Sequence, residues 1–371
     1  MKRVLGFLSI FIVVLIGYYV QPILFPPDTT SSPVEPSARP AKRNSLKHET
    51  VATAGCAQYI GLPISEVEMD LGPPTKIELS GFLFEMRTYP IEGGLLQANV
   101  VDGVITALKV MGEENKESPF EFGMSNGDLA EQMTLSSNFA VNYNDEPIDI
   151  ELTEDDMRFR PLIAFDNGTF AVPFFDGANE ELFAVAYLDV ETLLRVMPYH
   201  IYSGNPLSFQ SQENNFDWEQ VNQQKELQVM ELVNVYRSFQ KMPPLETSTA
   251  IAADSEAMLA DFLAQPQSVL SRDRQDEWAT NSEAHAGNFS FSLRDKEFQN
   301  LAKKQEVNQE TGLFYSPVID PWFSLFSWIS QERWADRLLE EGDYQLGVAF
   351  NQQNVLVLLQ ELEQTEESDE R

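Results

Sequence analysis

The side chains that most often carry out chemistry are scarce in this sequence. Its 371 residues include one cysteine, Cys56, and three histidines, His48, His200 and His285. A single cysteine excludes an intramolecular disulfide and every zinc or iron–sulfur site that is built on cysteines. A histidine needs converging partners to bind a metal or to act as a base, and none is evident for these three. We therefore expect no metal and no other cofactor.

Carboxylates are the one catalytic residue type in abundance, with 58 aspartates and glutamates. In so acidic a chain, a pair such as Asp254 and Glu256 is typical of a solvated face and does not by itself indicate a site. The sequence has no glycine-rich phosphate loop, no Gly-x-Ser-x-Gly elbow and no Asp-x-Asp-x-Asp-Gly calcium loop. The usual signatures of nucleotide-binding, serine-hydrolase and calcium-binding proteins are therefore missing.

Large aromatic residues gather near the end of the chain, at Trp322, Phe323, Phe326, Trp328 and Trp334. A run of this kind is more often the buried face of a helix than a platform for a ligand. Burial is therefore the default interpretation, and a role in ligand binding needs a further argument.

The net charge excludes one class of partner. The chain carries 25 lysines and arginines against its 58 acidic residues, which gives a net charge of −33. The first 50 residues have a net charge of +3, so residues 51–371 carry −36. Affinity for nucleic acid depends on cations that displace counterions from phosphates, so we expect no nucleic-acid partner.

The N-terminus predicts a membrane segment. Residues 1–25 begin Met-Lys-Arg and continue with an uncharged, mostly apolar stretch that is long enough to cross a bilayer. No small-x-small cleavage site closes this stretch, which favours an uncleaved anchor. We expect a single-pass protein of the cell membrane with its bulk outside, or a secreted protein if the segment is cleaved. A polar tether, residues 26–50, separates the segment from Cys56 and argues against a lipoprotein box there.

Residues 51–203 show one pattern twice. In residues 58–118, a short helix capped by Ser65 is followed by strand-like runs at 82–89, 95–101 and 104–110. In residues 119–202, a similar start leads to strand-like runs at 162–165, 169–175 and 182–188. Asp102-Gly103 predicts a tight hairpin turn. We interpret the pattern as a divergent duplication of a unit made of a helix and an antiparallel sheet.

A polar linker, residues 204–224, separates this domain from a second one at 225–363. Apolar residues recur at helical spacing over 227–236 and 251–262, and a polar stretch follows at 272–310. A third helix is expected at 322–339, with strands at 345–350 and 355–362, and residues 364–371 form an acidic tail. The expected fold class is therefore α+β.

Several motifs of the second domain occur in a recognisable order. They are Leu-Val-Asn-Val-Tyr-Arg at 232–237, Pro-Leu at 244–245, Ile-Ala at 251–252, Trp328, Leu-Leu at 338–339 and Leu-Gly-Val at 346–348. Through them the domain resembles the CAP superfamily, which includes cysteine-rich secretory, antigen 5 and pathogenesis-related 1 proteins. The first domain, with Ile-Gly at 60–61 and Leu-Gly-Pro at 71–73, resembles the CAP-associated N-terminal domain of membrane-attached bacterial CAP proteins. The resemblance implies an α-β-α sandwich with a central cleft.

In many CAP proteins this cleft holds two histidines and two acidic residues that can bind a divalent cation. The family's histidine positions match Met258, Leu270 and Trp334 in this sequence, and Asp261 is the acidic residue that is kept. Glu283 is one candidate for the glutamate of a degenerate Gly-Glu-Asn motif. The resemblance therefore implies a cleft without imidazoles. Trp334, at a histidine position of the family, would turn a metal pocket into an apolar one.

His285 lies beside the degenerate motif and is expected to be a loop histidine, although a relocated cleft ligand is the alternative. The candidate residues of the ligand cleft are Met258, Asp261, Glu283, His285, Trp328 and Trp334.

These observations favour a membrane-tethered extracellular binding protein with a non-catalytic CAP domain at the cell envelope. Its expected partner is an envelope protein, a peptide or a small apolar ligand. The alternative is a cell-wall hydrolase with Asp261 and Glu283 as acid and base, whose carboxyl groups would lie roughly 5–9.5 Å apart. A third hypothesis is that the second domain only stabilises the first.

Overall fold

The computed structural model describes residues 48–112, 118–196, 198–204, 207, 216–284, 290–307, 310–338 and 344–361. All of these residues belong to one compact unit. The expected membrane segment, nearly all of the tether, the acidic tail and His285 lie outside the described residues. Within the described residues, no helix is long and apolar enough to span a membrane.

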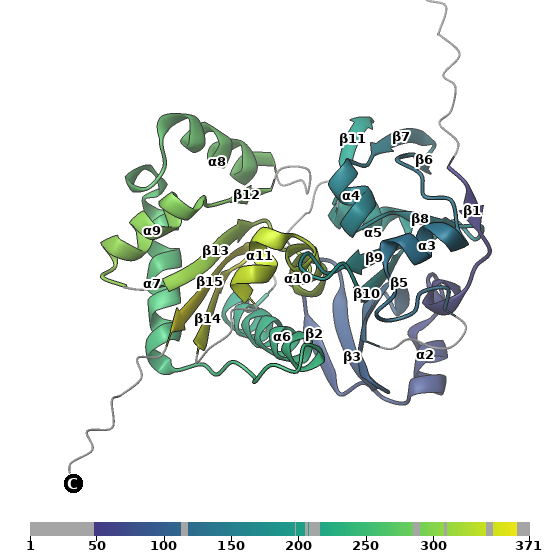
Figure 1. The fold of residues 1–371 in the computed structure, drawn as a ribbon, viewed down its shortest axis with the longest axis horizontal. Coiled ribbons are helices and arrows are strands. Elements are labelled where there is room, and N and C mark those ends of the chain that lie inside the picture. The colour runs from purple at the N-terminus through teal and green to yellow at the C-terminus, as the bar shows by residue number, and fades with distance from the viewer. Residues whose placement is uncertain are drawn as a thin grey trace, which may run out of the picture. The chain divides into compact units, whose positions relative to one another are not determined.

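The N-terminal part, residues 48–204, is built on an eight-stranded sheet in the order β1-β8-β9-β10-β5-β4-β3-β2 (Figure 1). Its strands are β1 (Thr50–Val51), β2 (Lys76–Leu79), β3 (Glu85–Ile91), β4 (Gly94–Val101), β5 (Val104–Gly112), β8 (Ile163–Phe165), β9 (Phe170–Phe175) and β10 (Leu182–Leu188). The first pass of the sequence pattern supplies β2 to β5 and the second supplies β8 to β10. The two sets join where β10 pairs with β5 in antiparallel orientation, and only the β1–β8 pair is parallel among the pairs described.

Each pass also contributes a short helix near its start. These helices are α2 (Ile64–Leu71) and α3 (Asn126–Gln132), and a 3-10 helix η1 (Gly55–Tyr59) precedes α2. The turn between β4 and β5 has positive φ angles at both Asp102 and Gly103, as a two-residue hairpin of type I′ requires. The predicted hairpin is therefore confirmed.

A second, three-stranded sheet in the order β11-β7-β6 was not predicted. It consists of β6 (Asn138–Tyr143), β7 (Glu146–Glu151) and β11 (His200–Ser203). Two short helices accompany it, α4 (Glu154–Phe159) and α5 (Val190–Val196). Alternate residues of β6, Phe139 and Val141, are buried, so the pattern of a half-buried strand is present but short.

The C-terminal part, residues 216–361, has a four-stranded sheet in the order β12-β13-β15-β14. Its elements are α6 (Trp218–Phe239), α7 (Thr249–Ala264), η2 (Pro266–Ser268), α8 (Arg272–Ala284), β12 (Phe291–Ser292), α9 (Asp295–Lys304), β13 (Glu310–Ser316), α10 (Pro321–Ile329), α11 (Glu332–Leu338), β14 (Tyr344–Asn351) and β15 (Asn354–Glu361). Helix α6 begins inside the segment expected to be a linker, because Asp217 caps it by accepting a hydrogen bond from the Gln220 N–H. The helix expected at 322–339 is divided into α10 and α11 near Ser330.

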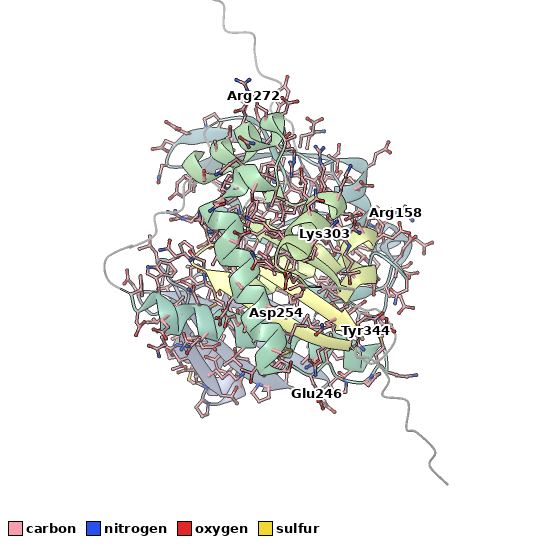
Figure 2. All side chains as sticks on the ribbon, turned by 90° about the vertical axis from the view of Figure 1, so that its left-hand side faces the viewer. Arg158, Glu246, Asp254, Arg272, Lys303 and Tyr344 are labelled. Carbon is pink, nitrogen blue, oxygen red and sulfur yellow. The ribbon has the colours of Figure 1, made fainter. Side chains whose placement is uncertain are left out.

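Helices cover both faces of this sheet. Along β15, Leu356 and Leu358 belong to one apolar cluster and Val355, Val357 and Leu359 to another, as alternation along a strand requires. The first cluster contains buried residues of α7 and α9, and the second contains buried residues of α6 and α10. Figure 2 looks onto the first of these faces, with Asp254 on α7 and Lys303 on α9 labelled. The sheet is therefore the middle layer of a three-layer arrangement.

The second apolar cluster is shared between the N-terminal and C-terminal parts. Phe174 of β9 packs edge-on against Phe323 and Phe326 of α10, with ring centroids 5.3 and 5.4 Å apart. Phe183 of β10 packs in the same way against Tyr236 of α6, at 5.2 Å. The two parts therefore have one hydrophobic core in common.

Candidate functional site

The residues at the family's histidine positions are buried, and they lie in different cores. Met258 and Leu270 belong to the cluster formed with α7 and α9, whereas Trp334 belongs to the cluster on the opposite face of the sheet. Each is at most 5 % exposed. Met258 and Trp334 therefore contribute to packing on two sides of the sheet, not to one shared cluster.

Asp261, the acidic position that is kept, lies on α7 and forms an ion pair with Lys304 of α9 at 2.7 Å. The Lys304 ammonium also donates to the hydroxyl of Ser268. The backbone of Glu283 is part of α8, but its side chain and all of His285 lie outside the described residues. The carboxyl separation expected for a hydrolase therefore stays a prediction.

Trp328 is different, because it lies on the wall of a cavity of about 400 Å³. The N-terminal part forms one side of this cavity. Its lining residues there belong to α4 and its two flanking residues, and to the segment that leads into β11. The other side comes from β13 and α10. The volume is within the range of pockets that hold small ligands.

Helix α10 presents a polar stripe to the cavity. Ser324, Ser327 and Gln331 recur at helical spacing along this stripe, at α10 and just beyond its end. Phe323 and Trp328 flank it and anchor the helix in the shared core. The cavity wall therefore combines hydroxyl and amide groups with an aromatic base.

The indole of Trp328 carries an unused hydrogen-bond donor. The residue is 1 % exposed, and its Nε1–H has no partner among the described residues. Tyr315, which also lines the cavity, packs against the indole in an edge-on arrangement, with ring centroids 5.5 Å apart. A buried donor without a partner costs about 1–3 kcal/mol. Nε1 itself has almost no accessible surface, so an acceptor in the cavity reaches it only if neighbouring side chains move.

The charged groups of the cavity are already paired. On the N-terminal side, Asp156 accepts hydrogen bonds from the Thr153 N–H at 2.9 Å and from Arg160 Nε at 2.7 Å. Asp156 is 3 % exposed, and Thr153 and Asp156 form the capping box of α4. The Asp156 carboxylate is therefore held in place by Thr153 and Arg160, and it is not free to take up a proton.

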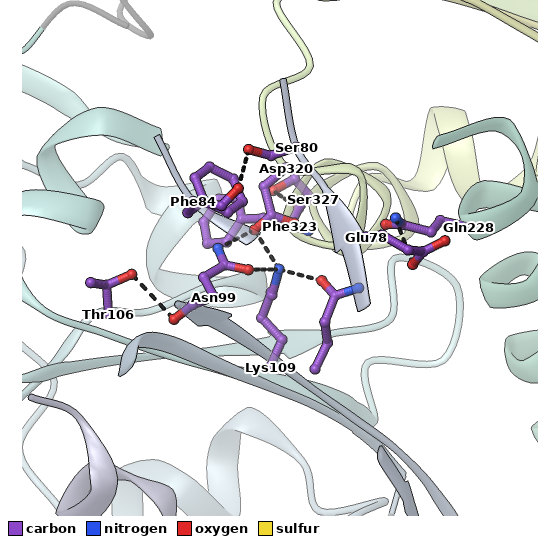
Figure 3. A network of polar contacts seen from close by, with 11 residues as sticks. Glu78, Ser80, Phe84, Asn99, Thr106, Lys109, Gln228, Asp320, Phe323 and Ser327 are labelled. Atoms are coloured by element: carbon purple, nitrogen blue, oxygen red, sulfur yellow. Dashed lines mark hydrogen bonds and ion pairs between the residues drawn. The ribbon is translucent and has the colours of Figure 1, made fainter. Parts of the chain in front are cut away.

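On the other side, Asp320 is held by a buried polar network (Figure 3). One carboxylate oxygen caps α10 by accepting from the Phe323 N–H at 3.1 Å. The other oxygen accepts from Asn99 Nδ2 at 2.8 Å and forms a short ion pair with Lys109. Lys109 is completely buried, and it also donates to Gln97 at 2.6 Å. Burial lowers the pKa of the Lys109 ammonium, and the Asp320 carboxylate opposes this.

This network links two parts of the chain that are far apart in the sequence. Lys109 lies on β5 and Asn99 on β4, in the N-terminal sheet, whereas Asp320 begins α10. The N-terminal sheet therefore fixes the start of the helix that forms the cavity wall.

A second buried cation lies at the same interface. Lys225 of α6 is completely buried, and its ammonium donates to the Gln352 carbonyl at 3.1 Å. The ammonium lies over the rings of Phe82, Trp218 and Phe350 at 4.8, 5.8 and 5.7 Å. Burial lowers the pKa of Lys225 to about 7. Phe82 comes from the N-terminal part, so this cage also spans both parts.

Comparison with known proteins bears on both parts. Residues 60–199 match the family model described as CAP-associated N-terminal. The chain has a CAP-associated N-terminal domain joined to a CAP/SCP-type fold. Two solved structures share this fold. They confirm the prediction of a CAP-like α+β fold.

One of these structures is an extracellular protein containing an SCP domain from Bacillus anthracis strain Ames. It is 20 % identical, with a TM-score of 0.64 over 86 % of this chain and 99 % of that one. The other is a cysteine-rich secretory protein from Staphylococcus aureus Mu50, 13 % identical, with a TM-score of 0.63 over 85 % and 95 % of the two chains. Both similarities cover the CAP-associated domain and the CAP-type domain together.

A relative from Bacillus subtilis strain 168 spans nearly the whole chain. The uncharacterized membrane protein YlbC is 21 % identical over 355 residues, which are 95 % of this chain and 96 % of YlbC. Relatives of both the CAP-associated and the CAP-type domains are thus described as membrane, extracellular or secretory proteins.

Of the residues that the sequence suggested for a ligand cleft, Trp328 lines this cavity, and its role in binding stays a prediction. Thr153, Asp156 and Arg160 lie in a segment for which no helix was predicted, and Pro198 and His200 lead into an unpredicted strand. The Thr-x-x-Asp spacing at Thr153 is a capping signal that could have indicated α4. No local signal joins that segment to Trp328.

Proposed function

We propose that this protein is a membrane-attached, extracellular binding protein that takes its ligand in the cavity between the CAP-associated and CAP-type domains. The observation that carries the proposal is the cavity of about 400 Å³ itself, whose wall joins residues of both domains and includes the aromatic residues Phe323 and Trp328. A ligand in this cavity would contact these aromatic residues together with the polar stripe of Ser324, Ser327 and Gln331.

Binding explains the site better than proton transfer does. Both carboxylates on the cavity wall, Asp156 and Asp320, are buried and accept hydrogen bonds from cationic and backbone donors. Asp261 is held by Lys304. A general base must be free to accept a proton from its substrate, and these three are engaged. No observation favours the hydrolase, so we do not propose it.

The N-terminal segment and the relatives support attachment to the cell membrane with the folded part outside. Protease added to intact cells would degrade the folded part and leave a membrane-bound N-terminal fragment. A chain that is protected until the cells are lysed would contradict this orientation, and a chain found in the medium would indicate a cleaved segment.

Ligand binding can be followed at Trp328 itself. The chain has five tryptophans, so full-length protein in nanodiscs with 5-fluorotryptophan would give five ¹⁹F signals, each assigned by a Trp→Phe variant. The probes are a random heptapeptide library, N-acetylglucosamine oligomers and palmitate. We expect one of them to shift the Trp328 signal and Trp328→Phe to weaken its binding at least tenfold.

The matched control is Trp278→Phe. Trp278 packs in the cluster on the other face of the CAP sheet, with Phe262 and Phe291, and is not on the cavity wall. This variant should bind like the wild type. If all three probe classes leave the Trp328 signal unchanged at millimolar concentration, the binding proposal is wrong.

A further inference from the structure

We propose that Lys109 forms an amide cross-link with Asn99 inside the folded protein, and that Asp320 moves the protons. The reaction joins the neighbouring strands β5 and β4 and releases one ammonia. It needs no bound ligand, so it is independent of the proposed binding function. Three features of the buried network in Figure 3 support it, namely the exclusion of water, the contacts of the Asn99 amide and the position of the carboxylate.

The surroundings of Lys109 favour an uncharged amine. Lys109 is completely buried, and Asn99 and Asp320 are 1 and 2 % exposed. Burial lowers the pKa of the Lys109 ammonium. The charge of Asp320 opposes this shift, but its carboxylate also contacts Nζ directly and can accept the proton. An uncharged amine has the free electron pair that a nucleophile needs.

The Asn99 amide is the group that this amine can attack. Lys109 Nζ lies 2.9 Å from Asn99 Oδ1. Since a carbonyl bond is about 1.2 Å long, Nζ lies at most about 4.1 Å from the Asn99 Cγ atom. Reacting atoms in productive geometries lie about 3–3.5 Å apart, so a side-chain movement of about 1 Å brings the two atoms together.

Asp320 lies where the leaving group must receive a proton. The Asp320 oxygen that contacts Lys109 also accepts a hydrogen bond from Asn99 Nδ2 at 2.8 Å. One carboxylate oxygen therefore contacts both the nitrogen that attacks and the nitrogen that leaves. Turning the amide over would place its NH₂ group beside the ammonium and its oxygen beside the carboxylate. Only the observed orientation pairs donors with acceptors.

Gln97 offers a second amide to Lys109 but lacks this arrangement. Its Oε1 accepts a hydrogen bond from Nζ at 2.6 Å, and Gln97 lies directly opposite Lys109 in the β4–β5 pair. Its Nε2, however, has no hydrogen-bond partner among the described residues. No carboxylate is therefore in position to protonate that nitrogen, and Gln97 serves to position Nζ beside Asn99.

The reaction is balanced without any further reagent. Asp320 takes a proton from the Lys109 ammonium, and the resulting amine attacks Asn99 Cγ to form the Nζ–Cγ bond. Asp320 gives that proton to Nδ2, the Cγ–Nδ2 bond breaks with its electron pair on nitrogen, and ammonia leaves. Asp320 then takes the surplus proton from Nζ and ends as the carboxylic acid. No group is oxidised or reduced.

The surroundings give ammonia an exit, and the product constrains the chain. Asn99 lines a small cavity of about 120 Å³, and Asp320 lines the larger cavity. The product ties β4 to β5, and such a link restricts the unfolded chain as a disulfide does. With one cysteine, the chain cannot form an intramolecular disulfide. The ion pair of Lys109 and Asp320 is the state before the reaction.

Mass spectrometry and trypsin test the cross-link on the full-length chain. The folded protein is incubated in nanodiscs at neutral pH and then denatured. We expect an intact mass that is lower than the sequence mass by one ammonia. Trypsin should not cleave after a modified Lys109, so residues 88–116 should appear as one peptide that lacks one ammonia. Cleavage after Lys76, whose ammonium pairs with Glu231, is the control in the same digest.

Two variants separate the roles of the side chains. Asp320→Asn keeps the cap of α10 but has no carboxylate to move the protons, so it should keep its sequence mass and be cleaved after Lys109. Asn99→Asp offers a carboxyl group to the same lysine, so it should lose one water in place of one ammonia. A cooperative thermal transition shows that each variant is folded.

Four outcomes would overturn the inference. Wild-type protein with its sequence mass and complete cleavage after Lys109 would have no cross-link. Loss of ammonia with normal cleavage there would indicate that Asn99 has cyclised on its own backbone. Loss of one water from the wild type would show that Asp320 itself is joined to Lys109. Fragment ions of residues 88–116 that assign the bond to Gln97 would show that the wrong amide has been named.

Discussion

Lys225 shows what a single buried side chain does at the interface of the two domains. Its ammonium is surrounded by three aromatic rings and one carbonyl, and burial lowers its pKa from 10.5 to about 7. Between these two pH values the unfolded chain holds a proton that the folded protein lacks. The free energy of unfolding must therefore rise with pH in this window, by up to about 1.4 kcal/mol per unit from this group.

Lys225→Met tests this linkage, because methionine fills a similar volume without a charge. We expect the variant to be more stable than the wild type below pH 7, where the cost of burying the ammonium is complete. The advantage should shrink steadily from pH 7 to 10. Urea denaturation of both proteins at matched pH values measures the difference. Parallel curves across this range would contradict the assignment.

Gly81 is a second residue that matters for the interface of the two domains, because the structure has no room for a Cβ atom there. Its φ is +79°, and a Cβ there would lie 2.4 Å from the Trp218 ring of the CAP-type domain. Gly103 has a similar φ of +80°, but nothing lies within 4 Å of its Cβ position. The two glycines therefore share a backbone requirement and differ in packing.

Gly103→Ala should cost about 1–2 kcal/mol, the penalty of a left-handed residue with a Cβ. Gly81→Ala should cost about 1–3 kcal/mol more, because Trp218 must move. Thermal unfolding of both variants measures this difference. Equal losses would mean that the Gly81 loop does not press on Trp218 in solution.

At the scale of elements, α10 is held at its start by the N-terminal sheet. Asp320 caps this helix and also neutralises the buried Lys109. Lys109→Met and Asp320→Asn should each cost about 3–5 kcal/mol, because either one leaves a buried group without its partner. The double variant should cost much less than the sum. Asparagine keeps the helix cap, so the cycle isolates the ion pair.

The control cycle uses Lys76 and Glu231, an ion pair at 2.7 Å whose side chains are 41 % and 35 % exposed. Solvent screens this pair, so its coupling energy should stay below about 1 kcal/mol. Urea denaturation of the four proteins in each cycle gives both values. A similar coupling in the two cycles would show that burial adds nothing to the Lys109–Asp320 pair.

Elements were predictable where an apolar pattern was strong. The β4–β5 hairpin follows from alternating apolar residues and the Asp102-Gly103 turn. Helices α8 and α9 were missed in the polar stretch at 272–310. Only Phe298, Leu301 and Ala302 of α9 are buried, and α8 packs with little more than Trp278 and Arg274. In α9 the buried residues do follow helical spacing, but they span little more than one turn within a polar stretch, and α8 shows no such pattern.

The cavity could not have been predicted in the same way. Thr153 and Trp328 line one cavity but are separated by nearly half of the chain. Their proximity depends on the shared core of Phe174, Phe183 and Phe326, which is a property of the tertiary structure alone. The resemblance indicated a cleft within the CAP-type domain, whereas this cavity also requires the CAP-associated domain.

At the scale of the molecule, the shared core predicts how the protein unfolds. Separate domains usually bury modest interfaces and melt independently. Here the aromatic core, the Asp320 network and the Lys225 cage all join the two domains. Unfolding of one domain would therefore expose buried apolar and charged groups of the other domain to water.

We expect a single cooperative transition for the full-length chain in nanodiscs, with equal calorimetric and van't Hoff enthalpies. Asp320→Asn should lower that one transition without dividing it. Two transitions, or a variant that lowers the melting of the CAP-type domain alone, would show that the domains are independent. A cavity formed by both of them could then open without unfolding either.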